Sequence, residues 1–121
     1  MALADRRCEA CHGGIPPLTA QRTEELLQEL DGWALGETGK TIHKWFTFKN
    51  FHQTMAFVNA VAWIAHLEDH HPDLLVRYSR CEVTYFTHPI SGLSENDFIC
   101  AAKIDRLFSQ DSAGVKSGGK W

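Results

Sequence analysis

The segment GWALGETGKTIHKWFTFKNF, residues 32–51, carries the signals that decide the fold. It joins a short apolar piece from Trp33 to Leu35 to a longer run from Thr41 to Phe48 through a glycine-bearing turn. The longer run is rich in aromatic and β-branched residues, which favour strands, so the segment predicts a β-hairpin. Because side chains alternate along a strand, Ile42 and Phe46 share one face, which we expect to lie on the core.

A long helix is predicted directly after this hairpin. Asn50 is a suitable N-cap, and apolar residues then recur at helical spacing from Phe51 to about Asp69. Pro72 prevents the helix from continuing. The predicted apolar stripe consists of Phe51, Met55, Val58, Ala62 and Ala65, broadened by Phe57, Val61 and Ile64. The opposite, more polar stripe consists of His52, Asn59, Trp63, His66 and His70.

Further elements are predicted on both sides of this central part. The segment LTAQRTEELLQEL, residues 18–30, favours a short helix with Thr19 as its N-cap and Gly32 as its stop. The pieces Leu74–Tyr78 and Cys81–Thr87 are typical of two short strands. We therefore expect a second hairpin after the long helix.

The closing helix completes the predicted fold. In GLSENDFICAAKIDRLF, residues 92–108, Ser94 caps the helix and Asp97 forms the acidic half of a capping box. The order is then helix, two strands, helix, two strands, helix. Strands joined as hairpins imply an antiparallel sheet. The sequence therefore predicts an α+β fold, a four-stranded antiparallel sheet with three helices packed on one face.

Composition indicates a single domain of ordinary character. The 121 residues are 44% hydrophobic and 22% charged. We expect an irregular N-terminal arm over residues 1–17, a domain over residues 18–109, and a flexible, glycine-rich tail over residues 110–121. The net charge of −3 argues against nucleic-acid binding. There is no apolar run long enough to span a membrane and no signal peptide, so we expect a cytoplasmic protein.

The cysteines suggest more than one interpretation. Reduced thiols are expected in the cytoplasm, and Cys81 and Cys100 lie in apolar patterns typical of small buried side chains. The run CEACH, residues 8–12, fits the C-x-x-C-H pattern of covalent haem attachment, which requires export. A zinc site from Cys8, Cys11 and His12 has no evident fourth ligand, although a subunit contact could supply one. We favour a loose arm with no cofactor.

The run HLEDHHPD, residues 66–73, is the strongest chemical signal in the chain. His66 and His70 are four positions apart and could hold a metal from one helix face, with Asp69 where H-x-x-E-H has Glu. Histidines at a helix C-terminus could instead simply cap it. That explains adjacent His70 and His71 less well, because neighbouring positions on a helix point about 100° apart.

A third interpretation is proton transfer without a metal. Imidazole titrates near neutral pH, and two imidazoles on one substrate can perform the acid and base steps together. The second imidazole would come from His88, at the exit of the last predicted strand. Strand exits are places where rigid scaffolds present reactive groups.

The segment from residue 66 to residue 105 resembles the pterin-4a-carbinolamine dehydratase family. The family's signature appears in order as His70-His71-Pro72, Tyr78, Thr87-His88, Gly92-Leu93-Ser94 and Asp97. The pieces DGW, residues 31–33, and KWFTFKNF, residues 44–51, are also similar to the family. The resemblance covers about residues 18–108, and the combined motif is specific where a lone HHP would not be.

The resemblance implies an activity and a site. Members remove water from 4a-hydroxy-tetrahydropterin, the product of aromatic amino-acid hydroxylases, to give quinonoid dihydropterin in tetrahydrobiopterin recycling. They use no metal and assemble as homodimers or homotetramers. The implied catalytic residues are His70, His71 and His88, and the implied pterin-binding residues are Asp69, Phe86, Thr87 and Pro89. Animal relatives also act as dimerisation partners of a transcription factor, so a non-catalytic coactivator role is the alternative.

Two departures from the family affect these expectations. Relatives often carry Glu at the position of His66, so any role of that carboxylate is in doubt here. Pro89 removes a backbone N–H that a relative could offer the ligand. In the expected reaction one histidine protonates the leaving oxygen on C4a while another accepts the N5 proton. We favour His88 as the acid and expect His71 to position the substrate.

Overall fold

The computed structural model describes residues 2–10 and 15–118, with side chains as far as Ser109. The α-helices are α1 (Ala20–Leu27), α2 (Phe51–Glu68) and α3 (Glu95–Gly118). The strands are β1 (Ala34–Leu35), β2 (Ile42–Thr47), β3 (Asp73–Val76) and β4 (Arg80–Tyr85). Two 3-10 turns are η1 (Leu3–Asp5) and η2 (His88–Ile90).

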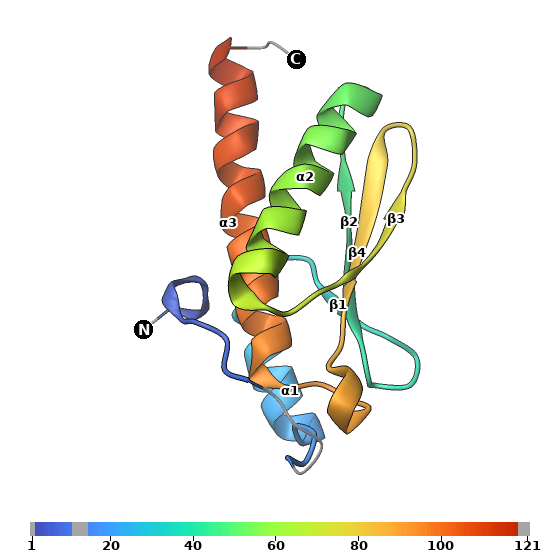
Figure 1. Cartoon of the computed structure of the whole chain (residues 1–121), viewed down its shortest axis with the longest axis vertical. Helices are drawn as coiled ribbons and strands as arrows, with labels where there is room; N and C mark the ends of the chain where they lie inside the picture. The colour runs from blue at the N-terminus through green and yellow to red at the C-terminus, as the bar shows by residue number, and fades with distance from the viewer. Residues whose placement is uncertain (1, 11–14, 119–121) are drawn as a thin grey trace.

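The four strands form one antiparallel sheet in the order β1-β2-β4-β3. β4 is central, with Cys81 opposite Phe46 of β2 on one side and Val76 of β3 on the other. Helices α2 and α3 run side by side along one face of the sheet (Figure 1). The predicted α+β fold is therefore confirmed.

The core lies between this sheet face and the helices. Along β4 and its exit, Cys81, Val83, Tyr85 and Thr87 are buried in strict alternation, as expected for a strand with one covered face. Phe46 of β2 contacts Phe57 of α2 and Phe108 of α3 at ring-centroid distances of 4.7 and 5.1 Å. The aromatic contacts fasten both long helices to the sheet.

The buried face of α2 differs from the predicted stripe. Asn50 caps the helix as predicted, accepting a hydrogen bond from the Gln53 N–H at 2.9 Å. The buried apolar residues of the helix are Phe57, Val61 and Ala65. Phe51, which heads the predicted stripe, is 48% exposed, and Ala62 is exposed as well. α2 is apolar on most sides, so periodicity could not decide which side meets the sheet.

The N-terminal arm is packed against the domain, so the prediction of a loose arm is wrong for its described part. Leu3 is only 5% exposed and belongs to the core. Arg6 pairs with Glu95 of α3 at 2.8 Å, and the Cys8 N–H donates to Glu68 of α2 at 2.8 Å. These are single long-range contacts, which leave no periodic pattern in the sequence. Cys11 and His12 lie outside the described residues.

Helix α3 continues past its predicted end near Phe108 and stays helical to Gly118. The sequence after Phe108 contains no proline, and a single interior glycine weakens a helix by only about 1 kcal/mol. Among the described residues, no helix combines the length and apolar character needed to cross a membrane.

Candidate active site

The C-terminal end of α2 turns the first histidine of the HHP motif toward the core. The helix ends at Glu68, and Asp69 takes a left-handed conformation with φ of 51°. The His70 backbone N–H then donates to the Ala65 carbonyl at 3.1 Å. His70 therefore leaves the helix, and the metal hypothesis that placed His66 and His70 on one helix face does not hold.

The His70 ring is hydrogen-bonded to a buried carboxylate in the first turn of α3. His70 Nε2 lies 2.6 Å from Oδ1 of Asp97, whose side chain is 0% exposed. The other oxygen, Oδ2, accepts from the Thr87 hydroxyl at 2.8 Å and the Ser94 N–H at 2.9 Å. Since Thr87 donates to Asp97, the Ser94 hydroxyl donates to Thr87 Oγ1 across 2.8 Å. The carboxylate is thus fixed in position by donors from two elements.

The surroundings of His70 favour its charged form. Its ring stacks on Tyr85 of β4 at a centroid distance of 5.5 Å and an interplanar angle of 7°. Burial by itself would lower the pKa of His70, but the hydrogen bond to Asp97 and the Asp97 charge outweigh it. The pKa of His70 is therefore raised above its usual value. Because Nε2 is bonded to Asp97, Nδ1 is the ring atom left for a ligand.

The exit of β4 forms the other side of the site. The Thr87 N–H donates to the Gly92 carbonyl at 2.8 Å, which closes the loop that carries η2. His88 begins η2 and is exposed, and its ring lies 4.0 Å from that of Phe86 between centroids. A Cβ on Gly92 would come within 2.9 Å of Pro17, so glycine allows the loop to pack on the arm.

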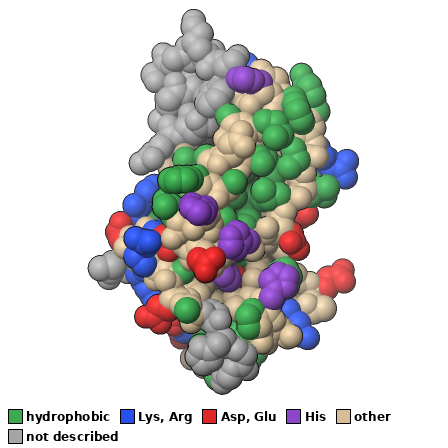
Figure 2. Space-filling model, in the orientation of Figure 1, with side chains coloured by type: hydrophobic (Ala, Val, Ile, Leu, Met, Phe, Trp, Pro, Cys, Tyr) green, Lys and Arg blue, Asp and Glu red, His purple; other side chains and the backbone are tan. Residues whose placement is uncertain are grey.

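The remaining predicted site residues are exposed. His71 and Asp69 flank His70 in the chain, and Pro89 lies in the first turn of η2. Figure 2 shows histidine side chains gathered on one face, between the end of α2 and the loop after β4. The HHP segment and the β4 exit are joined through Asp97, which is bonded to both His70 and Thr87.

Two members of this site were not predicted as site residues. We interpreted Asp97 only as a helix cap and motif residue, and Tyr85 only as part of a strand. Asp97 does make the capping contact, through the Ser94 N–H, yet its second oxygen serves His70. For Asp97, an acid in the first turn of a helix gives no sequence signal for a partner in another element. For Tyr85, the alternation of side chains along β4 was a signal that its side chain lies inside.

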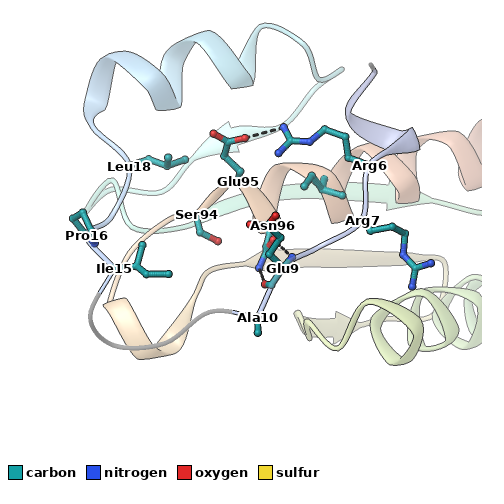
Figure 3. Close-up of a pocket in the computed structure, with 11 residues that line it drawn as sticks. Arg6, Arg7, Glu9, Ala10, Ile15, Pro16, Leu18, Ser94, Glu95 and Asn96 are labelled. Carbon is teal, nitrogen blue, oxygen red and sulfur yellow. Dashed lines mark hydrogen bonds and ion pairs between the residues drawn. The ribbon is translucent and has the colours of Figure 1, made fainter.

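A separate pocket of about 310 Å³ lies between the arm and the start of α3 (Figure 3). Its walls include Arg6, Arg7, Glu95 and Asn96, and none of the histidines within residues 2–10 and 15–118 lines it. Ser94 is the residue it shares with the Asp97 network. In the described part of the chain, no three His, Cys, Asp or Glu side chains gather in the manner of a metal site.

Comparison with known proteins shows a family relationship over most of the chain. A family model described as pterin 4 alpha carbinolamine dehydratase matches residues 16–107, which include all the residues of the His70–Asp97 network. The chain belongs to this family. The expected resemblance is thereby confirmed.

Curated relatives carry the same name. A protein of Nitrosospira multiformis, named "Putative pterin-4-alpha-carbinolamine dehydratase", is 61% identical over 106 residues, which cover 88% of this chain and 92% of the relative. A Legionella pneumophila protein of the same name is 50% identical, with 87% and 94% covered.

Solved structures show the same fold. A Brucella melitensis protein described as a transcriptional coactivator/pterin dehydratase matches with a TM-score of 0.72 and 34% identity, covering 75% of this chain and 97% of that one. A pterin dehydratase-like protein, described as a RuBisCO assembly factor in the alpha-carboxysome, matches with a TM-score of 0.57 and 24% identity. That match covers 64% of this chain and 90% of the other, and it bears on the fold alone.

Proposed function

We propose that the protein is a 4a-hydroxytetrahydrobiopterin dehydratase, a hydro-lyase that forms quinonoid dihydropterin in tetrahydrobiopterin recycling. The observation that carries this proposal is the buried Asp97 carboxylate held against His70 Nε2 at 2.6 Å. In hydrolytic triads a carboxylate in this position fixes the histidine tautomer and stabilises the imidazolium. A histidine so placed is equipped to accept a proton through Nδ1.

The reaction needs one proton removed and one added. His70 accepts the N5 proton of the substrate, and Asp97 stabilises the imidazolium that forms. His88 protonates the hydroxyl on C4a, which leaves as water while the N5–C4a double bond forms. Each transfer contributes about 10²- to 10⁴-fold in rate. No metal or cofactor is required in this scheme, so we expect dialysis against a strong chelator to leave the activity unchanged.

The remaining residues serve binding and support. Exposed His71 positions the pterin, with Asp69, Phe86 and Pro89 around it. Thr87 is only 1% exposed, and its hydroxyl is bonded to Asp97. We therefore assign Thr87 to the support of Asp97, not to direct contact with the pterin.

A dehydration assay tests the proposal. An aromatic amino-acid hydroxylase generates 4a-hydroxy-tetrahydropterin in place, and its decay is followed by absorbance with and without this protein and with and without chelator. Faster decay that the His70→Ala change removes would support the proposal. Decay at the uncatalysed rate with folded wild-type protein would contradict it. If the chelator removed a stoichiometric amount of zinc and the activity were lost with it, the chemistry would instead be metal-dependent.

Assembly is the second part of the proposal, and it also concerns the alternative function. Trp63 and Leu67 on α2 are 61% and 51% exposed, and hydrophobic side chains gather along α2 in Figure 2. A monomer this small would leave this surface unprotected, so we propose a homodimer or homotetramer. The same surface favours a transcription-factor partner as the second candidate function, and the Brucella relative is described as a transcriptional coactivator.

Sedimentation tests the assembly at micromolar concentration, where a stable monomer would contradict it. The second candidate function requires assembly without catalysis, so an inactive and oligomeric wild-type protein would favour it. The expected cytoplasmic location and the coupling to a hydroxylase remain predictions.

A further inference from the structure

Two cysteine sulfurs from opposite ends of the domain lie next to each other. Sγ of Cys8, in the N-terminal arm, is 3.4 Å from Sγ of Cys100, in α3. In the sequence, Cys100 belongs to an apolar pattern and Cys8 to an irregular arm, so no sequence signal joins the two thiols. The sulfurs of a disulfide are about 2.05 Å apart, so a small rotation of the side chains would bring these atoms into bonding distance.

The arm is held so that Cys8 stays at this position. Its N–H donates to Glu68 at 2.8 Å. The next residue, Glu9, exchanges two hydrogen bonds with the Asn96 side chain, one through its N–H at 3.0 Å and one through its carbonyl at 2.6 Å. Arg6 is tied to Glu95 on the other side (Figure 3). Cys8 is therefore fixed on the surface of α3 by the residues around it.

The two thiols differ in access and in acidity. Cys100 is 0% exposed, whereas Cys8 is partly exposed, so an external reagent reaches Cys8 first. The hydrogen bond from Cys8 lowers the pKa of Cys100, against the opposing effect of burial, and the nearby His70 lowers it further. The hydrogen bond with Cys100 and burial raise the pKa of Cys8. Access therefore makes Cys8 the sulfur that meets the external disulfide, and the lowered pKa suits Cys100 to the second, resolving step.

We propose that Cys8 and Cys100 form a redox-active dithiol that closes to an intramolecular disulfide by exchange with a small-molecule disulfide. The Cys8 thiolate attacks one sulfur of the external disulfide and releases one thiol, leaving a mixed disulfide on Cys8. The Cys100 thiolate then attacks the Cys8 sulfur and releases the second thiol. The protein dithiol loses two protons and two electrons, and the external disulfide becomes two thiols.

The bond would join the arm covalently to the helix that carries Asp97. It would close a loop across most of the domain, and long loops give the largest entropic gain on cross-linking. Cys100 also lies beside the buried hydroxyl of Tyr85. The dithiol therefore lies directly behind the ring on which His70 stacks.

The experiment equilibrates the purified full-length protein in buffers of rising ratio of oxidised to reduced glutathione. Free thiols are then alkylated, and the protein is digested without reduction for peptide mapping by mass spectrometry. We expect a Cys8–Cys100 linked peptide in the wild type, in Cys11→Ser and in Cys81→Ser. Cys81 is buried like Cys100 but does not contact Cys8, so it is the matched control.

Two variants separate the steps of the exchange. Cys100→Ser should accumulate glutathione on Cys8, because the resolving thiolate is missing. Cys8→Ser should leave Cys100 reduced at every ratio. Cys8 is not a core residue, so this variant keeps the proposal testable even if Cys100→Ser fails to fold. Circular dichroism of each variant establishes whether it is folded.

Stability gives an independent measurement. Oxidation should raise the Tm of the wild type by several degrees, and it should leave the Tm of Cys8→Ser unchanged. A wild-type product linked between Cys8 and Cys11 would overturn the proposal. So would a stable glutathione adduct on Cys8 of the wild type, or a Cys100 thiol that stays free at the most oxidising ratio.

Discussion

His70 and His88, the two histidines assigned to proton transfer, lie in opposite surroundings. The side chain of His70 is 11% exposed, bonded to a buried carboxylate and stacked on Tyr85. His88 is exposed at the start of a short 3-10 turn and contacts Phe86. One histidine is fixed by the core, and the other is presented by a loop.

This difference indicates how the two roles are divided. A base must offer a lone pair at a defined atom, and Asp97 achieves this by occupying Nε2 and leaving Nδ1. An acid on a loop can exchange its proton with water between turnovers. Substitutions at these residues and at their partners test this division.

Replacing either member of the pair should have the largest effect. His70→Ala and His88→Ala should each lower kcat by about 10²- to 10⁴-fold and weaken pterin binding far less, since each acts on transition-state charge. The double variant should cost less than the sum of the two single changes, because a pair acting in one step fails when either is missing. Steady-state kinetics measures kcat and KM of the single and double variants. A His88→Ala variant with near-full kcat would show that the site has been assigned to the wrong residues.

Asp97→Asn should distinguish a base at position 70 from an acid. The amide can donate to His70 Nε2, which moves the ring proton to Nδ1 and removes the accepting lone pair. We expect kcat to fall about 10²-fold or more, by analogy with triad carboxylates. A rate close to that of the wild type would show that His70 does not act as the base.

The pH dependence of kcat/KM in Asp97→Asn should show in which direction the carboxylate shifts the pKa of His70. A base works when unprotonated, so wild-type kcat/KM should fall as pH drops through the raised pKa of His70. Without the Asp97 charge this limb should move to lower pH, because the pKa returns toward its usual value. A limb that moves to higher pH would contradict the assignment.

His71→Ala should affect substrate binding more than the chemical step. We expect KM to rise at least as strongly as kcat falls, about 10-fold, because His71 contributes binding energy present before the transition state. The far-ultraviolet circular dichroism should not change, since His71 is exposed. A large loss of kcat at constant KM would instead place His71 in the proton-transfer step.

Thr87→Val should lower the stability of the buried His70–Asp97 network, with a smaller effect than the changes above. The change keeps the shape but removes one donor from the buried Asp97 carboxylate, which costs about 1–3 kcal/mol in the free energy of unfolding. Urea unfolding measures it. Thr84→Val is the matched control, since Thr84 lies on β4, whose end Thr87 follows, and on the face opposite to that of buried Val83 and Tyr85. Equal losses in both variants would show that the hydroxyl of Thr87 has no special role.

His66→Glu should have the smallest effect. It restores the residue common in relatives at an exposed position near the end of α2, where His66 contacts Trp63. We expect the fold to be kept and kcat/KM to change less than about 3-fold, within the range of surface substitutions. A gain of 10-fold or more would mean that the site lacks a carboxylate it needs.

The sequence predicted the parts of the fold that depend on neighbouring residues. Thr19 and Asn50 cap the helices as expected, since a cap bonds within three residues along the chain. Cys81 is buried on the strand, as its apolar sequence surroundings predicted. The site motif was predicted by residue type and spacing, and Asp97 is bonded to one residue of each half, His70 and Thr87.

Other features required the tertiary structure, because their partners are far apart in the chain. His70 meets Asp97 across 27 positions, and Cys8 meets Cys100 across 92. The inner side of α2 was also decided by packing, because the helix is apolar on more than one side. Local chemistry thus determined the elements and the candidate histidines. The packing of α3 against the end of α2 decided which histidine receives the buried carboxylate.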